Sequence, residues 1–288
     1  MTSKHVKNLF KDRDWPIVVC FANQKGGVGK TTLAVQFALY CHEVLKKKVL
    51  CIDLDHQGDF TQSLSDKDEI GNPVLGESLT TELFNPEAGD VNPIETSSGI
   101  HLIGTTMRNT KLLAVEELPV EEAYYSQEHL NNVFPNFDVV VMDCPPLPGR
   151  TMRAALFMAH YVITPIGFGG YGINGVSFTS DMTEEARKAI ENITGEAQDY
   201  PRFLGAVINL ATKVNEAQEF ADSINQKHPD LFFKNVIGNR DGLKNASFQG
   251  KSIWSQRYQH VAGAEMLRLF EEAFSRIVEN EKAIEKSK

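Results

Sequence analysis

The sequence IVVCFANQKGGVGKTTLAVQFALY, residues 17–40, carries the strongest structural signal in this chain. Residues 17–22 are apolar and rich in β-branched side chains, which is typical of a strand buried on both faces. A glycine-rich turn follows, and residues 30–45 have apolar side chains on or near one helical stripe. A strand that passes through a glycine-rich turn into a helix is the local structure of a phosphate-binding loop.

The turn itself, residues 25–32, has the composition that phosphate binding requires. Its glycines let backbone N–H groups close around phosphate oxygens, where a Cβ would obstruct them. Lys30 is expected to reach the β- and γ-phosphates, and the Thr31 hydroxyl to ligate Mg²⁺. The general pattern GxxxxGK[ST] is not matched in full, because Gln24 stands where its first glycine belongs and an extra lysine, Lys25, opens the turn. The residues expected to hold the nucleotide here are Lys25, Gly26, Gly27, Val28, Gly29, Lys30, Thr31 and Thr32.

Two further apolar runs end in aspartate. VLCIDLDHQGDFTQSL contains Asp53 and Asp55, and VVVMDCPP contains Asp143 followed by two prolines. Ligands of doubly wound sheets bind beyond the carboxyl ends of the strands, so these carboxylates are expected beside the phosphate loop. A carboxylate there can hold the water shell of Mg²⁺. Alone, each aspartate is a weak signal, but the order of loop, paired aspartates and third aspartate is a strong one.

These segments resemble those of the ParA/MinD superfamily of deviant Walker A ATPases. FANQKGGVGKTT is especially close to the ParA branch, and VVVMDCPP is similar to the family's D-x-P-P Walker B element. The switch segment resembles D-x-D-P-Q-G-N-x-T, but His56 replaces the usual proline and Asp59 the usual asparagine, which puts loop rigidity and hydrolysis rate in doubt. The resemblance spans about residues 17–255 and implies ATP and Mg²⁺ as ligands and a homodimer that forms with ATP.

The resemblance also implies roles for single residues. Lys25 would reach across the dimer to the partner's ATP, in the role of an arginine finger. Asp55 would position or activate the attacking water, and Asp53 would support the Mg²⁺ shell. Asn209 stands where the family has an adenine-contacting asparagine. The implied catalytic residues are Lys25, Lys30 and Asp55, and the implied metal site consists of Thr31, Asp53 and Asp143.

The rest of the chain fits a parallel sheet between helices. Strands are expected at residues 17–22, 49–54, 139–143, 161–166 and 203–209, with weaker candidates at 100–104 and 235–238. Helices are expected at 30–45, 176–193, 214–227 and 262–284, and residues 65–98 should hold loops with one short helix. This alternation predicts a single-domain, doubly wound, mostly parallel α/β fold over residues 16–288. For the N-terminal extension, residues 1–15, a partner-docking peptide and a disordered lead both stay open.

Composition narrows the function classes. The 288 residues carry a net charge of −9, which argues against coating nucleic acid with the whole surface, although residues 231–260 hold five cations and one anion. Four scattered cysteines without a CxxC pair argue against structural zinc and a disulfide framework. No apolar run approaches the roughly 18 residues of a membrane span, and the N-terminus lacks the apolar region of a secretory signal. A cytoplasmic protein is expected.

Three functions are open to an ATPase of this kind. The leading one is a ParA-like partition ATPase, whose ATP dimer binds double-stranded DNA without sequence preference and whose hydrolysis a ParB-like or adaptor partner triggers. Lys244, Lys251 and Arg257 are candidate phosphate contacts, although solvated surface side chains are nearly as good an interpretation. A MinD-like membrane-surface ATPase is disfavoured by the acidic C-terminal tail, so no membrane is expected. An iron–sulfur carrier is rejected, because Cys144 has no suitably placed second cysteine. Plasmid, chromosome and protein-assembly cargoes all stay open.

Overall fold

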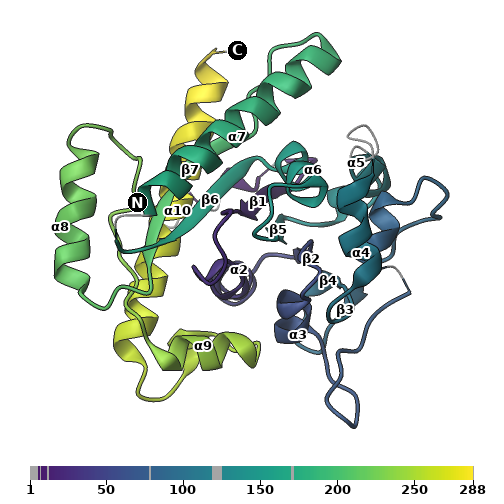
Figure 1. Ribbon diagram of the computed structural model, residues 1–288, viewed down its shortest axis with the longest axis horizontal. Helices are drawn as coiled ribbons and strands as arrows, with labels where there is room; N and C mark the ends of the chain where they lie inside the picture. The colour runs from purple at the N-terminus through teal and green to yellow at the C-terminus, as the bar shows by residue number, and fades with distance from the viewer. Residues whose placement is uncertain are drawn as a thin grey trace.

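A seven-stranded sheet forms the centre of the computed structural model, which describes residues 6, 8–11, 13–77, 79–118, 125–169 and 172–287 (Figure 1). The strand order is β3-β4-β2-β5-β1-β6-β7. All neighbouring strands pair in parallel except β3, which runs antiparallel to β4. The strands are β1 (Ile17–Phe21), β2 (Val49–Asp53), β3 (Ile94–Glu95), β4 (His101–Ile103), β5 (Val139–Asp143), β6 (Tyr161–Gly167) and β7 (Arg202–Asn209). The predicted doubly wound α/β fold is confirmed.

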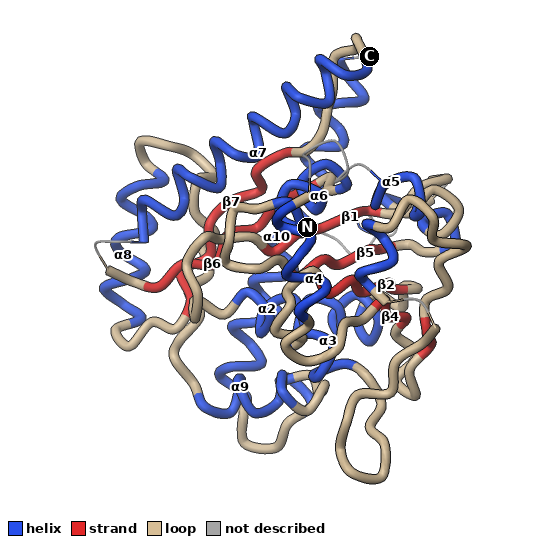
Figure 2. The backbone as a smooth tube through the Cα atoms, turned by 45° about the vertical axis from the view of Figure 1, so that its right-hand side comes forward, coloured by secondary structure: helices blue, strands red, loops and turns tan. Residues whose placement is uncertain are grey.

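Helices cover both faces of this sheet (Figure 2). The α-helices are α2 (Lys30–Leu39), α3 (Asp59–Leu64), α4 (Thr110–Ala114), α5 (Tyr125–Leu130), α6 (Arg150–Met158), α7 (Gly172–Thr194), α8 (Val214–Asn225), α9 (Asp241–Phe248) and α10 (His260–Ser287). A π-helical turn, η1 (Tyr40–Val44), continues α2, and the short 3₁₀ turns are η2 (Thr80–Phe84), η3 (Val115–Glu117), η5 (Phe134–Asn136) and η6 (Ile253–Ser255). All four long helices expected from periodicity are present. The short helix expected within residues 65–98 is η2.

Strand β1 explains why the predicted strands are apolar at every position. Ile17, Val19 and Phe21 belong to the core cluster that includes α2 and α10. Val18 and Cys20 belong to the cluster on the other face, which includes α6. Successive side chains of a strand point to opposite faces, so a strand covered on both sides has no position that can be polar.

Helix α10 packs against α2 through aromatic side chains. The Phe37 ring stacks on Phe274 with centroids 5.5 Å apart and planes 4° apart, and Phe270 meets Phe37 edge-on at 5.3 Å. Phe270, Phe274 and Ile277 are all buried. Burial of each such side chain stabilises the fold by about 1.5–3 kcal/mol. The prediction that these residues of the C-terminal helix are core residues is confirmed.

The described part of the N-terminal extension also packs on the domain. The ring of Phe10 lies 6.1 Å from that of Phe274, and Trp15 meets Phe134 edge-on at 5.6 Å. Arg13 forms a 2.7 Å ion pair with Glu281 of α10. These contacts tie Phe10 and Arg13 to α10 and Trp15 to η5.

One weak strand prediction is wrong. Residues 235–238 form no strand, and Gly238 makes only an isolated parallel bridge to Ala211 beyond the end of β7. Ile237 is nevertheless buried, and its N–H donates to Ile208 O at 2.9 Å. The apolar residues of this segment therefore reflect burial under α10 rather than membership of the sheet.

The carboxyl ends of the three central strands meet at one edge of the sheet. Phe21 of β1 and Asp53 of β2 are both register partners of Asp143 in β5. The glycine-rich turn therefore lies next to the two aspartates that the sequence predicted as its neighbours. None of the helices described is long and apolar enough to span a membrane.

Candidate active site

The glycine-rich turn between β1 and α2 has a backbone that only glycine readily adopts at two positions. Gly27 and Gly29 have φ values of 73° and 88°, in the left-handed region. A Cβ on Gly29 would also overlap the side-chain amide of Asn209. Asn209 Nδ2 donates to Val28 O at 2.9 Å, so the end of β7 is fastened to the turn. The turn is thus held in a shape that leaves its N–H groups at the start of α2, where the helix dipole favours an anion.

Asn23 anchors the other end of the turn, and sequence reasoning did not identify it. Its Oδ1 accepts from the Lys25 N–H at 2.8 Å, and its Nδ2 donates to Pro165 O of β6 at 2.8 Å. The side chain is buried and packs against Gly175 of α7. Asn23 therefore sets the direction in which the backbone at Lys25 leaves β1.

The two lysines of the turn occupy different environments. Lys30 is only 6% exposed, and its Nζ donates to Lys25 O at 3.3 Å, which holds the ammonium inside the turn. Lys25 has an exposed side chain. One lysine can therefore meet a phosphate bound within the turn, and the other is free to meet a group outside this chain.

Asp143 lies beside the first turn of α2. The Thr31 hydroxyl donates to Asp143 Oδ2 at 2.6 Å. Asp143 Oδ1 is buried and has no hydrogen-bond partner among the described residues. Burial and the neighbouring Asp53 carboxylate raise the pKa of Asp143 well above its usual range, against the effect of the Thr31 hydrogen bond. A nearby divalent cation reverses such a shift.

These residues fit Mg²⁺ in one particular way. An unsatisfied buried carboxylate oxygen is costly, and carboxylate and hydroxyl oxygens are ligands that Mg²⁺ prefers. Within the described part of the chain, no three His, Cys, Asp or Glu side chains gather into a metal cage. Mg²⁺ commonly binds through one or two carboxylates together with substrate phosphates, which is what Asp143 and Thr31 allow.

Asp53 is fully buried, and its oxygens are engaged by the switch segment. Its Oδ2 accepts from the Thr61 N–H at 2.8 Å and the Thr61 hydroxyl at 2.7 Å, and its Oδ1 accepts from the Asp55 N–H at 3.1 Å. Burial raises the pKa of Asp53 to about 7, although the hydrogen bonds from Thr61 lower it. Asp53 thus ties the end of β2 to the first turn of α3. Thr61 is the second residue that sequence reasoning missed, although it is the last letter of the D-x-D-P-Q-G-N-x-T pattern.

Asp55 lies nearer to the surface than Asp53. Its side chain is 14% exposed, and its Oδ1 accepts from the Gln57 N–H at 3.0 Å. The adjacent His56 carbonyl accepts from the Asn109 N–H at 2.8 Å, which fastens the switch segment to the residues before α4. The structure therefore leaves Asp55 accessible while its backbone is fixed. Asp59, by contrast, is exposed.

The structure brings most of the predicted site together. Residues 25–32, Asp53, Asp55, Asp143 and Asn209 all lie at the carboxyl edge of the sheet. Asn209 is fully buried against the turn, and its Oδ1 has no partner among the described residues. Lys244, Lys251 and Arg257 lie elsewhere, on and after α9, and all three are exposed.

Comparison with known families gives the same assignment. Residues 17–194, more than half of the chain, match the model of an AAA domain. The chain belongs to this AAA domain family. Its relatives identify it further as a member of the ParA/MinD superfamily of ATPases, which confirms the resemblance found in the motifs.

Two curated relatives of this ParA/MinD-type chain cover most of its length. The chromosome-partitioning ATPase Soj of Thermus thermophilus is 29% identical over 267 residues, which are 91% of this chain and 96% of Soj. The sporulation initiation inhibitor protein Soj of Bacillus subtilis is 26% identical over 240 residues, 82% of this chain and 89% of that protein.

Solved structures agree on the ParA/MinD fold. Apo McdA from Cyanothece superposes with a TM-score of 0.68 at 19% identity, covering 91% of this chain and 99% of McdA. A putative plasmid partition protein from Borrelia burgdorferi, bound to AMPPNP, superposes with a TM-score of 0.68 at 20% identity. The superposition covers 89% of this chain and 99% of that protein. At this identity the likeness establishes the fold alone.

Proposed function

We propose that this chain is an ATP-dependent dimerising switch that partitions or positions DNA, by binding DNA non-specifically and hydrolysing ATP when a ParB-like or adaptor partner stimulates it. The observation that carries the proposal is the pair of lysines in the phosphate loop, with Lys30 buried inside the loop and Lys25 exposed on it. The curated relatives named as partition ATPases support the biological role. A plasmid, a chromosome and a protein assembly are all compatible cargoes.

The loop fits ATP with Mg²⁺. Backbone N–H groups of residues 26–31 and the Lys30 ammonium would bind the phosphates, and Thr31 and Asp143 would hold the cation. When bound, Mg²⁺ neutralises charge that develops on the transferred phosphoryl group. Asp55, accessible at the edge of the sheet, would orient the attacking water and accept its proton. Asp53 would keep the switch segment in place through Thr61, and Asn209 would brace the loop.

The exposed position of Lys25 supports the proposal that the protein acts as a dimer. Its side chain is exposed on the outside of the loop, whereas that of Lys30 is buried within it. A cation presented in this way can stabilise charge on a nucleotide bound to a second copy, as arginine fingers do. Two copies facing each other through their loops would each complete the other's site, so that ATP favours the dimer and hydrolysis dissolves it.

Lys25→Ala is expected to leave ATP affinity nearly unchanged and to weaken ATP-dependent dimerisation about tenfold, because the lost cation acts between subunits. Sedimentation with ATP, ADP and no nucleotide measures the dimer, and a fluorescent ATP analogue measures binding. Lys227→Ala, which removes an exposed lysine after α8, serves as the control. An ATP dimer of unaltered strength in the Lys25 variant would remove the cross-subunit role.

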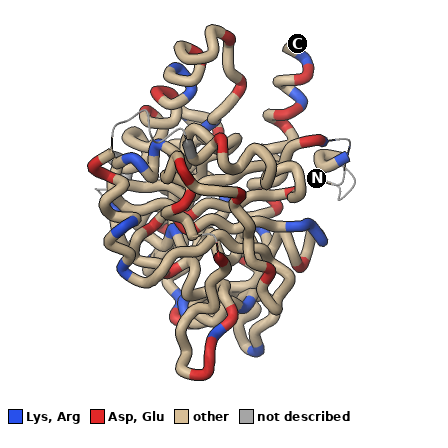
Figure 3. The backbone as a smooth tube through the Cα atoms, turned by 90° about the vertical axis from the view of Figure 1, so that its right-hand side faces the viewer, with Lys and Arg blue, Asp and Glu red and all other residues tan. Residues whose placement is uncertain are grey.

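The face that we propose for DNA lies around α9. Lys244, Lys251 and Arg257 are exposed there, whereas Arg240 forms an ion pair with Glu265 of α10. In Figure 3, which views the backbone from another side than Figure 1, lysine and arginine positions are interspersed with aspartate and glutamate positions. A local basic face on an acidic protein gives binding that is weak, non-specific and salt-sensitive. Such binding in the ATP state would associate the protein with the nucleoid.

Replacing Lys244, Lys251 and Arg257 together by alanine is expected to lower the affinity of the ATP form for random-sequence duplex DNA about tenfold or more at low salt. The plot of log affinity against log salt concentration should also become less steep, because fewer counterions are released on binding. Filter binding across a salt series measures both quantities.

The matched control removes the same charge from exposed positions away from α9, at Lys111, Lys227 and Lys286. If the two triple variants lose DNA affinity equally, net charge and not this face explains the binding. If the wild type dimerises with ATP but binds no DNA, the ATP-dependent switch is still supported. The surface on which it acts must then be a protein assembly or a membrane.

A membrane-surface role has less support. It would need a free apolar face on a basic C-terminal helix. In α10 the apolar residues Phe270, Phe274 and Ile277 are buried in the core, and Glu271, Glu279 and Glu285 are among its charged residues. We therefore propose that the ATP-bound protein binds DNA rather than a lipid surface.

A further inference from the structure

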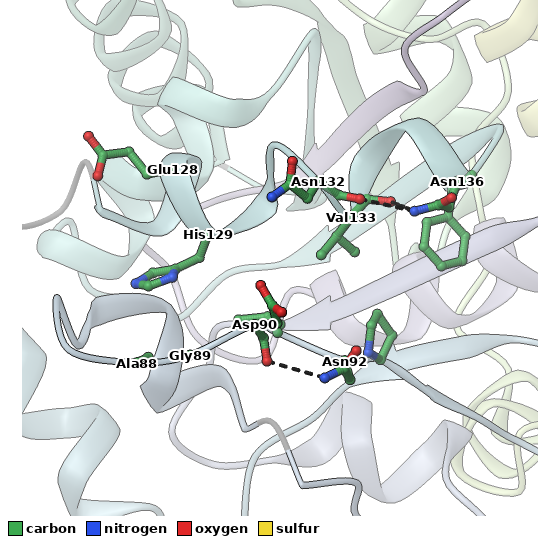
Figure 4. Close-up of a pocket in the computed structure, with 12 residues that line it drawn as sticks. Ala88, Gly89, Asp90, Asn92, Glu128, His129, Asn132, Val133 and Asn136 are labelled. Carbon is green, nitrogen blue, oxygen red and sulfur yellow. Dashed lines mark hydrogen bonds between the residues drawn. The ribbon is translucent and has the colours of Figure 1, made fainter.

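A cavity outside the nucleotide site lies beside the amino end of β5, the end of that strand opposite to Asp143. It has a volume of about 720 Å³, within the range of about 300–1,000 Å³ that ligand pockets occupy. One wall is the loop that contains Asp90 and the other is the end of α5 with the turn after it, where Glu128 and Asn132 lie (Figure 4). Nothing in the ATPase machinery uses this cavity.

The position of the cavity keeps it apart from the nucleotide. Val133 and Phe137, which line it, precede β5, whereas Asp143 is the last residue of that strand. Five residues of β-strand span roughly 17 Å. An occupant of the cavity can therefore bind at the same time as ATP.

The cavity has an apolar floor and an acidic rim. Val91, Val133 and Phe137 in its lining are buried, and Asp90 and Glu128, which also line it, are exposed. No lysine or arginine lines it. Across the described residues, neither carboxylate belongs to an ion pair.

The Phe137 ring already has a cation against it. The Lys48 ammonium lies 4.9 Å from the centroid of this ring, and His101 meets the ring edge-on at 5.0 Å. The ring is thereby fixed, and aromatic faces of this kind attract ammonium and guanidinium groups. Lysine and arginine also bury an aliphatic stem against apolar surface while the charged head stays at the rim.

We infer that this cavity binds a lysine- or arginine-bearing segment of a partner protein, with the aliphatic stem on Val133 and Phe137 and the charge between Asp90 and Glu128. DNA and anionic lipid are excluded as occupants, since both would bring negative charge to two carboxylates. The inference goes beyond the proposed ATP switch, because it assigns a second site that a partner can occupy in either nucleotide state.

The test is fluorescence anisotropy of a short labelled peptide of alternating lysine and alanine, titrated with the full chain without nucleotide at physiological ionic strength. Asp90→Asn with Glu128→Gln is expected to weaken peptide binding about tenfold, because two charge-assisted contacts are lost. The control, Glu69→Gln with Glu77→Gln, removes the same two charges from exposed positions outside the cavity and should change the affinity less than about twofold.

A second variant separates the cavity from its charge. Asn132→Phe places a ring at the opening without changing net charge, and it too is expected to weaken the peptide about tenfold. A peptide with glutamate in place of lysine should not bind. Absence of lysine-peptide binding, equal weakening by both charge variants, or binding of spermidine without binding of the peptide would each overturn the inference. Basal ATP hydrolysis should be the same in all these variants, so a failure here leaves the ATPase proposal intact.

Discussion

Lys30→Ala should lower the affinity for ATP about a hundredfold or more. Lys30 is 6% exposed and held inside the loop, so its ammonium meets the phosphates in a desolvated setting. Removal of one partner from a buried, hydrogen-bonded charge pair costs about 2–5 kcal/mol, and each 1.4 kcal/mol is about a factor of ten in affinity. Titration with a fluorescent ATP analogue in the presence of Mg²⁺ measures the loss.

Folding must be separated from binding in this experiment. Lys30 contributes a hydrogen bond to Lys25 O, so its removal also loosens the empty loop by about 1 kcal/mol. Urea unfolding of the nucleotide-free variant therefore accompanies the titration, and Lys227→Ala serves as an exposed-lysine control. If Lys30→Ala unfolds normally and still binds ATP tightly, the phosphate-loop assignment is wrong.

The central strands and the loop could be predicted because local sequence is sufficient to specify them. Val18, Val19 and their neighbours are apolar at every position since both faces of β1 are covered, and this leaves a direct mark on the sequence. Gly27 and Gly29 are required by positive φ, which is also a local property. The aspartates follow from these, because parallel strands put their carboxyl ends at one edge.

The parts that could not be predicted depend on contacts between distant segments. Ile237 is buried although its segment forms no strand, so its apolar neighbours in the sequence led to a false strand prediction. Asn23 is one polar residue in a loop until Pro165 of β6 supplies its second partner, 142 residues away. Thr61 acquires its role only because the first turn of α3 lies against Asp53. A single sequence carries no pattern for the contacts of Ile237 and Asn23, whereas the D-x-D-P-Q-G-N-x-T motif marks Thr61 without revealing its partner.

The cavity between Asp90 and Glu128 is a further case. Its walls are separated by more than thirty residues of sequence, and neither has a motif. A hydrogen bond between His129 Nε2 of α5 and Asn85 O, 2.9 Å long, joins the two sides. The sequence alone therefore offered no reason to expect a binding site in this part of the chain.

Asp55→Asn should reduce the rate of ATP hydrolysis about a hundredfold while ATP stays bound. Asparagine keeps the oxygen that accepts from the Gln57 N–H, so the turn after β2 persists, but it cannot accept a proton from water. Loss of a positioned general base lowers turnover by about 10²–10⁴. The variant should therefore accumulate as an ATP-bound dimer, which sedimentation and phosphate release measure together.

Asp59→Asn is the matched control for this prediction. It makes the same charge change four residues away in the same segment, at an exposed side chain that starts α3. We expect less than about a threefold effect on turnover, because an exposed charge at this distance is screened. Equal losses in both variants would mean that the negative charge of the segment, and not a base at Asp55, supports hydrolysis. Unaltered turnover in Asp55→Asn would instead assign the activation of water to another group. Asp53 would not be that group, because its hydrogen bonds are directed into the switch segment.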